Sequence, residues 1–85
     1  MSINSFWMKL QQNEGEEFST VSGLPFTYEF KGENSIRVSR ANQLISKSNF
    51  EKAMEYMPLK GPGEISKLVR GSAYVYALLT DERLQ

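Results

Sequence analysis

Residues 26–39 decide the fold; they read Phe-Thr-Tyr-Glu-Phe-Lys-Gly-Glu-Asn-Ser-Ile-Arg-Val-Ser. Apolar and polar side chains alternate over residues 26–30, and the same period of two returns around Ile36 and Val38. This alternation is typical of strands that bury one face. Turn-forming residues fill positions 31–34. The stretch therefore predicts a β-hairpin.

A further strand is expected before this hairpin. Residues 17–22 alternate in the same way, and Gly23-Leu24-Pro25 turns the chain toward residue 26. The sequence thus predicts a three-stranded antiparallel β-meander, with strands over residues 17–22, 26–30 and 35–39.

Three aromatic side chains share one face of the middle strand: Phe26, Tyr28 and Phe30. An aromatic face on an open sheet can stack the bases of single-stranded nucleic acid. In a chain of 85 residues the same face is needed to cover the helices. The core is therefore the favoured interpretation, with base stacking as the alternative.

Apolar residues at helical spacing predict a helix before the meander and a helix after it. The first helix is expected over residues 2–13, since Phe6 and Leu10 share a stripe with Ile3 and Trp7. The second is expected from Ser48 to Met57. Its start shows the spacing of a capping box, Ser48 with Glu51, and Pro58 follows its end.

Two further helices are expected, over residues 64–70 and 72–80, the last capped by Ser72. The second of these is ambiguous, because Tyr74-Val75-Tyr76 also has strong β-propensity. A helix is favoured, since Ala77-Leu78-Leu79 follows. The predicted fold class is α+β, one domain over residues 1–85, with an N-terminal helix, the meander, and two to three short helices packed on the sheet.

The composition excludes several kinds of chemistry. The chain has no His and no Cys, so we expect no Cys- or His-ligated zinc, no disulfide, no Cys nucleophile and no Ser–His–Asp triad. The best acidic cluster, Glu14, Glu16 and Glu17, is interpreted as a solvated turn. We therefore expect no enzyme, no metal and no cofactor. Without a signal-peptide pattern or a long apolar run, we expect a cytoplasmic protein and no membrane partner.

The zero net charge conceals a basic middle between acidic ends. Residues 1–30 carry one Lys and four Glu, a net of −3, whereas residues 31–70 carry eight basic and four acidic residues, a net of +4. Residues 71–85 carry a net of −1. Such asymmetry is typical of a surface that faces nucleic acid, and also occurs on ordinary solvated helices.

The layout of this basic segment suggests a DNA-binding helix-turn-helix. The two helices expected over residues 49–57 and 64–70 are joined by a turn that contains Pro and Gly. The second helix would enter the major groove with Ser66, Lys67 and Arg70 toward the duplex. The linker of six residues, 58–63, is longer than the usual turn of this motif.

The remaining basic residues of the segment are candidates for contacts with backbone phosphates: Arg37, Arg40, Lys47, Lys52 and Lys60. Together with Ser66, Lys67 and Arg70 they form the predicted nucleic-acid site. The sequence therefore predicts a small, non-catalytic binding module for duplex DNA.

The alternative function is a protein-interaction module, such as an adaptor, an inhibitor or a homo-oligomer. It rests on a surplus of apolar side chains. Trp7 is adjacent to Phe6, so at least one of them lies off the centre of the helix stripe, and Met8 follows; the segment around Tyr74 and Tyr76 is apolar on almost every side. Trp7, Met8, Tyr74 and Tyr76 are the candidate interface with a protein partner or a second copy.

Overall fold

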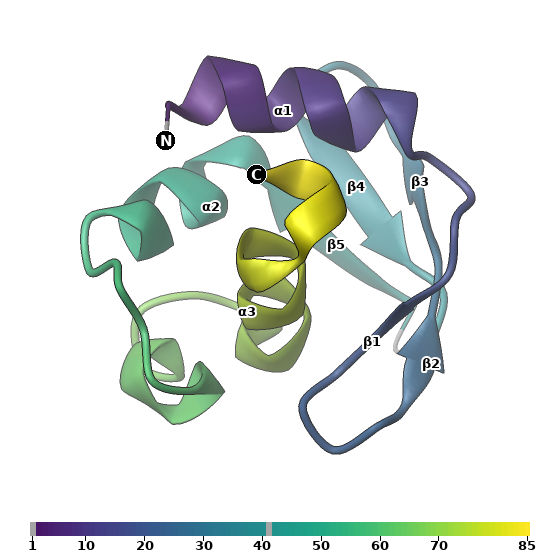
Figure 1. Cartoon of the computed structure of the whole chain (residues 1–85). Coiled ribbons are helices and arrows are strands. Elements are labelled where there is room, and N and C mark those ends of the chain that lie inside the picture. Colours follow the sequence, from purple (N-terminus) through teal and green to yellow (C-terminus); the bar gives the residue numbers. More distant parts are fainter. Residues whose placement is uncertain (1, 41) are drawn as a thin grey trace.

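A computed structural model describes residues 2–40 and 42–85 of the chain (Figure 1). It confirms the α+β class, because an N-terminal helix is followed by strands and then by short helices. The elements, with η for 3₁₀ helices, are α1 (Ile3–Gln12), β1 (Phe18–Ser19), β2 (Pro25–Phe26), β3 (Tyr28–Phe30), β4 (Ser35–Val38), β5 (Gln43–Ser46), α2 (Lys47–Met54), η1 (Pro62–Ile65), α3 (Ser72–Thr80) and η2 (Glu82–Leu84).

Helix α1 forms where the sequence predicts it. Ser2 is the N-cap, and its Oγ accepts a hydrogen bond from the N–H of Ser5 at 3.1 Å. This bond satisfies one of the donors that the first turn of a helix leaves unpaired. Phe6, Trp7 and Leu10 are buried where α1 packs on α2 and η2.

The strands form two sheets instead of one meander. β1 pairs with β2 in a short antiparallel hairpin, and β3, β4 and β5 form a three-stranded antiparallel sheet in that order. The predicted first strand, residues 17–22, thus belongs to a separate hairpin. The third strand of the main sheet is Gln43–Ser46, which the sequence pattern did not reveal. Only Ile45 of this strand is buried, so it carries almost no alternation.

The strand predicted over residues 26–30 is divided at Thr27. Phe26 pairs with β1, whereas Tyr28 pairs with β4. The N–H of Thr27 donates to the side-chain Oγ of Ser39 at 3.0 Å, and its C=O accepts from the N–H of Ser39 at 2.9 Å. Thr27 is therefore the point at which the chain changes its pairing partner.

The free edge of β3 is covered by the connection from α1 to β1. The N–H of Gly15 donates to the C=O of Tyr28 at 3.3 Å, and the N–H of Phe30 donates to a carboxylate oxygen of Glu14 at 2.6 Å. The Tyr28 hydroxyl donates to the C=O of Leu10. Since open strand edges pair readily with other chains, these bonds protect that edge.

Helix α2 runs over Lys47–Met54 rather than over residues 48–57. Ser46 is the N-cap residue but makes no capping bond; its Oγ lies 2.9 Å from the Oγ of Ser48. The capping box predicted for Ser48 and Glu51 is wrong, because Ser48 already lies inside the first turn.

The α-helix predicted over residues 64–70 does not form. The segment holds η1 and then a turn. The Oγ of Ser66 donates to the C=O of Gly63 at 3.1 Å, and the side chain of Glu64 turns back to accept from the N–H of Lys60. Local side-chain bonds of this kind compete with a regular helix.

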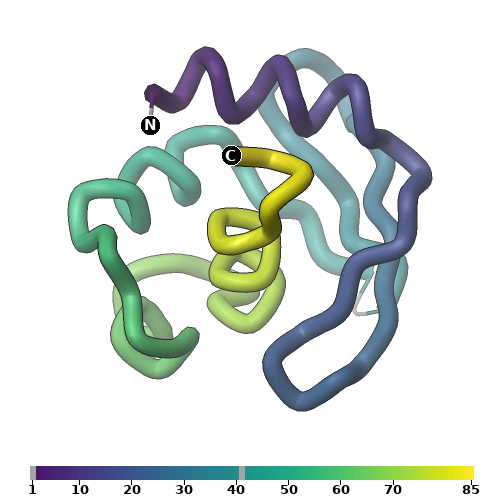
Figure 2. Tube along the Cα trace, viewed as in Figure 1, coloured from purple at the N-terminus to yellow at the C-terminus, as the bar shows by residue number. Residues whose placement is uncertain are grey.

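The ambiguous segment after it is the helix α3, as favoured above. Its N-cap is Gly71, at a φ of 60°, and not Ser72. This left-handed conformation favours glycine, and a Cβ at Gly71 would lie 3.0 Å from Cδ1 of Ile45. In Figure 2 the trace of α3 lies at the centre of the view, with α1 above it.

The core lies between the three-stranded sheet and the helices. Ile36, Val38 and Ile45 from the sheet are fully buried, as are Phe50 of α2 and Leu78 of α3. Phe26 and Tyr28 also belong to the core, so the base-stacking alternative for the aromatic face is wrong. Among the residues that the model describes, no helix is long and apolar enough to cross a membrane.

Candidate nucleic-acid interface

The outer face of the three-stranded sheet is a polar surface opposite the core. In β4, Ile36 and Val38 are buried and Arg37 between them is partly exposed. The strand register places Glu29, Arg37 and Leu44 in one row across the sheet. Figure 1 shows the helices gathered on one side of the sheet. The row therefore lies on the side that faces solvent.

A shallow depression of about 320 Å³ opens on this face. It lies between the α1–β1 connection and the start of the β3–β4 ladder. Its lining residues are Gly15, Thr27, Tyr28, Glu29, Arg37 and Ser39. The residues around the hollow thus include one arginine, one glutamate and two residues that carry aliphatic hydroxyl groups.

Arg37 has its guanidinium free to bind a ligand. Within residues 2–40 and 42–85 it makes no ion pair and no hydrogen bond. Its cross-strand neighbour Glu29 forms an ion pair with Lys31 instead, with 3.0 Å between Nζ and Oε1. A guanidinium carries five N–H donors in a planar fork that fits two oxygens of a phosphate.

The two hydroxyl groups next to Arg37 add further polar groups. Ser39 Oγ accepts the N–H of Thr27 at 3.0 Å, which leaves its own proton available to a ligand. The side chain of Thr27 makes no hydrogen bond among the described residues. Thr27 and Ser39 both line the same depression as Arg37.

Arg40 follows Ser39 and extends the positive surface toward the β1–β2 hairpin. Its Nε donates to the C=O of Pro25 at 3.0 Å, and the side chain is exposed. This bond holds the guanidinium in one orientation while its terminal N–H groups remain available. We call the surface formed by Thr27, Arg37, Ser39 and Arg40 the arginine face.

The other predicted basic residues lie elsewhere. Lys47, at the start of α2, donates from Nζ to Oδ1 of Asn4 at 3.2 Å. Lys52 is exposed on α2, which packs on the inner side of the sheet. The predicted site is therefore not one surface, because Arg37 lies on the outer face of the sheet and Lys52 lies on α2, on the other side.

Residues 60–70 do not present a recognition helix. Lys60, Ser66, Lys67 and Arg70 are exposed on the connection between α2 and α3. Since the α-helix expected over residues 64–70 is absent, the predicted helix-turn-helix lacks the helix that would enter the major groove.

The candidate protein interface is also dispersed. Trp7 is only 4% exposed and packs edge-on against Phe30 and Phe50, and its indole N–H donates to the C=O of Glu33 at 2.8 Å. Its prediction as a contact residue is therefore wrong, because the sheet and α2 cover both sides of the indole. Met8, its neighbour, is 58% exposed.

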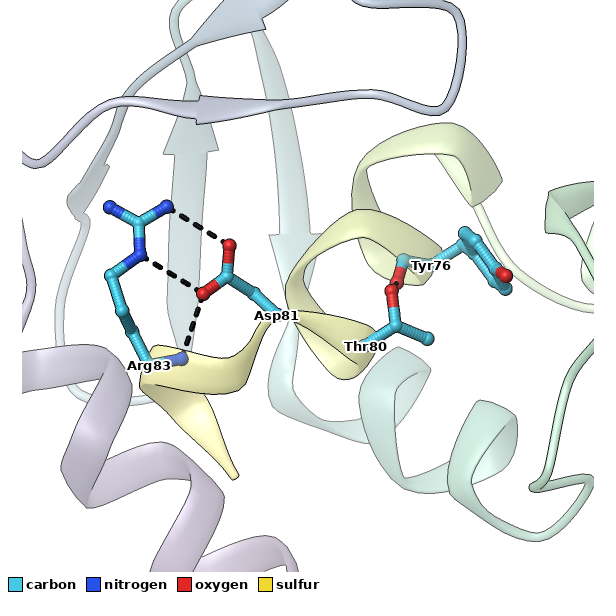
Figure 3. Close-up of polar contacts among 4 residues, drawn as sticks. All are labelled: Tyr76, Thr80, Asp81 and Arg83. Atoms are coloured by element: carbon cyan, nitrogen blue, oxygen red, sulfur yellow. Dashed lines mark hydrogen bonds and ion pairs between the residues drawn. The ribbon is translucent and has the colours of Figure 1, made fainter.

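Tyr74 and Tyr76 are half-buried on α3. Tyr74 packs edge-on against Phe26, with 5.0 Å between the ring centroids. The C=O of Tyr76 accepts from Oγ1 of Thr80 at 2.8 Å (Figure 3). Both tyrosines thus take part in packing within the domain.

The titratable groups with shifted pKa values have structural roles. Burial, with the nearby Glu14 carboxylate, raises the pKa of the Tyr28 phenol, whose hydroxyl is bonded to a backbone carbonyl. The Arg83 guanidinium lowers the pKa of Asp81 through two side-chain hydrogen bonds (Figure 3). The same guanidinium lies 3.9 Å from the centroid of the Phe18 ring. These contacts fix the C-terminal segment to β1.

No metal site is evident in the described part of the chain, where no three His, Cys, Asp or Glu side chains converge. The sequence singled out Arg37 and Arg40 but not Thr27 and Ser39, which the structure places around the same depression as Arg37. Thr27 lies two residues before Glu29, and Ser39 lies two residues after Arg37. This spacing was the available signal in the sequence, because residues two apart share one face of a strand.

Protein-family models, curated proteins and solved structures were compared with the chain, and none of them matches it. Its function has to be inferred from the residues of its surfaces.

Proposed function

We propose that this chain binds the phosphate backbone of nucleic acid, and specifically of duplex DNA, with its arginine face. The observation that supports the proposal most is Arg37, a half-buried and unpaired guanidinium in a depression with the hydroxyl groups of Thr27 and Ser39. Arginine and hydroxyl side chains are among the groups that contact phosphate oxygens in protein–DNA complexes.

The guanidinium groups of Arg37 and Arg40 form no ion pair among the described residues. The Glu29 carboxylate is paired with Lys31, and Glu14 is engaged by the N–H of Phe30. Two unpaired guanidinium groups beside two hydroxyl groups are complementary to a row of phosphates.

A duplex is favoured over a single strand because the aromatic side chains of these strands pack toward the core and not on the outer face. Proteins that bind single strands stack bases on aromatic side chains. The aromatic residues of these strands, Phe26, Tyr28 and Phe30, belong to the core or pack against it. Contacts with the backbone of a duplex need no such platform. The proposed role is binding without a catalytic step.

The proposal is tested with two double variants that remove equal charge. Arg37→Gln with Arg40→Gln alters the arginine face, and Lys67→Gln with Arg70→Gln alters the connection before α3. Binding of a mixed-sequence duplex is measured by fluorescence anisotropy over a range of salt concentrations. The slope of log K against log salt is negative, and each lost phosphate contact reduces its magnitude by about 0.9. The first variant should therefore reduce the magnitude of the slope by about 1.8.

The second double variant is the matched control, because the net charge of both variants is the same. We expect its salt slope to stay within experimental error of the unmodified protein. Equal losses in the two variants would indicate a net-charge effect without a site. An unchanged slope in the arginine variant would overturn the proposal, and the protein-interaction module would then be the function to pursue.

A further inference from the structure

The two edges of the three-stranded sheet differ in how their backbone groups are used. β3 and β5 are the outer strands, since the order of strands is β3-β4-β5. The edge of β3 is covered by the α1–β1 connection, through the hydrogen bonds of Gly15 and Glu14 described above. A strand edge that is not covered offers its N–H and C=O groups to another chain. Whether the sheet can be extended therefore depends on the edge of β5.

The ladder of hydrogen bonds shows which backbone groups of β5 point away from β4. The N–H of Lys47, directly after β5, donates to the C=O of Asn34 at 2.8 Å. In an antiparallel pair such bonds recur at every second residue. Ile45 therefore also bonds to β4. The backbone groups of Leu44 and Ser46, which alternate with Ile45, face the open side.

The outward-facing groups of β5 have no cover comparable to that of β3. Within residues 2–40 and 42–85, no turn, loop or side chain bonds to the N–H of Leu44 or of Ser46. The side chain of Leu44 is 51% exposed. β5 reads Gln-Leu-Ile-Ser and carries no charged side chain, although charge is a usual protection of a strand edge. This edge is therefore suited to pairing with another strand.

The two outward-facing residues are complementary to the same residues of a second copy. Leu44 and Ser46 are separated by one residue, so a two-fold axis through Ile45, perpendicular to the sheet, sets Leu44 of one copy opposite Ser46 of the other. The N–H of each Ser46 then donates to the C=O of the opposite Leu44, in two equivalent hydrogen bonds. A contact between identical copies about a two-fold axis requires such a self-complementary surface.

The charges near this edge do not oppose the pairing. In this register Lys47 lies opposite Gln43 of the second copy, and its Nζ is held by Oδ1 of Asn4 at 3.2 Å. Arg40, in the turn before β5, is directed toward the β1–β2 hairpin by the bond from its Nε to the C=O of Pro25. The net charge of the chain is zero, so two copies have no overall repulsion to overcome.

We propose that the chain forms a two-fold dimer in which β5 pairs antiparallel with β5 of a second copy, joining two three-stranded sheets into one. The inference does not depend on the proposed function. Because the axis is perpendicular to the sheet, Arg37 of both copies lies on the same outer face. The paired edge is only 4 residues long in each copy. The dimer therefore belongs to the weak interfaces, which bury less than about 1,200 Å².

The first experiment measures the mass of the unmodified protein by sedimentation equilibrium, from about 10 μM to about 1 mM. We expect the weight-average mass to rise with concentration toward that of two chains. Over the same range the N–H of Ser46 should exchange more slowly with solvent, because the dimer gives it an acceptor. Arg37→Gln with Arg40→Gln should give the same masses as the unmodified protein, since neither side chain lies on the paired edge.

Two charge variants test the geometry of the pairing. Leu44→Lys and Leu44→Glu each place like charges on diagonal neighbours across the axis, about 7–8 Å apart and within reach of long side chains. Each variant alone should keep the mass of a single chain, and an equal mixture of the two should dimerise again. Met8→Lys and Met8→Glu are the matched controls at an exposed position of α1, and each should dimerise alone. Circular dichroism checks that every variant is folded.

Three results would overturn the inference. A single-chain mass at every concentration would exclude the dimer and leave β5 to an extended segment of a different protein. Dimers of Leu44→Lys as stable as those of the unmodified protein would place the contact on another surface. A mixture of the two Leu44 variants that stays monomeric would contradict the two-fold pairing, because opposite charges then meet across the axis. None of these measurements uses DNA, so the salt slopes judge the proposed function separately.

Discussion

The arginine face and the connection between α2 and α3 are both basic in sequence, yet they differ in how their charges are arranged. On the arginine face, strand register fixes Arg37 beside a depression, and its acidic neighbour pairs elsewhere. On the connection, Lys67 and Arg70 stand on an irregular segment, and Glu64 is turned back onto it. The difference teaches that regular structure orients basic side chains on one surface, which an irregular segment does not.

The first way to sharpen this comparison is to truncate one apolar side chain in each region, a buried one at the sheet and an exposed one on the connection. Ile36→Ala, directly behind the arginine face, should lower the free energy of unfolding by about 2–5 kcal/mol, since a fully buried residue leaves a cavity. Leu68→Ala, on the connection, should cost less than about 1 kcal/mol because Leu68 is exposed. Urea denaturation measures both. Similar losses would mean that the connection is as firmly packed as the sheet.

A second prediction concerns Gly71, where the connection from α2 joins α3 and lies against β5 of the sheet. Gly71→Ala forces a side chain into the left-handed conformation against Ile45 of β5 and should cost about 1–3 kcal/mol. Gly63→Ala is the control, because a Cβ there meets no atom within 4 Å; it should change stability by less than about 0.5 kcal/mol. Thermal or chemical denaturation distinguishes them. A tolerated Ala at Gly71 would contradict the close contact with β5.

A third prediction separates geometry from charge. Arg37→Lys keeps the charge but loses the planar fork, so duplex affinity should fall about fivefold, equivalent to about 1 kcal/mol, with the salt slope unchanged. Lys67→Arg adds a fork on the connection and should leave affinity unchanged. Anisotropy titrations at fixed salt test both. If Arg37→Lys binds the duplex as tightly as the unmodified protein, the planar shape of the guanidinium contributes nothing to binding.

The smallest effect is expected at the Asp81–Arg83 pair. The pKa of Asp81 lies below its ordinary value of 3.8 in the folded chain, so the pair stabilises the fold above that pH and loses its effect as pH falls through the folded pKa. Because the pair is partly exposed, Asp81→Asn should cost only about 0.5 kcal/mol near pH 7. The difference from the unmodified protein should shrink as the pH is lowered toward 2 in denaturation series. A constant difference would assign the stabilisation to the backbone cap at Arg83.

Local patterns predicted the elements whose signals lie within a few residues. The stripe through Phe6 and Leu10 gave α1, the alternation around Ile36 and Val38 gave β4, and the run after Gly71 gave α3. Helical and strand periods are properties of the chain itself, and an amphipathic pattern records which face is buried. The same local signals misplaced the start of α2. Ser46 and Ser48 lie two residues apart and either can be an N-cap, and the structure uses Ser46.

The sequence by itself determined the α+β class, the absence of Cys and His chemistry, and the presence of Arg37 and Arg40 on a strand and its turn. Only the tertiary structure decided that β5 completes the sheet, that Trp7 is buried, and that the predicted basic residues do not share one surface. The physical reason is that strand pairing and burial join residues far apart in the chain. Their free energy depends on partners that no local pattern contains.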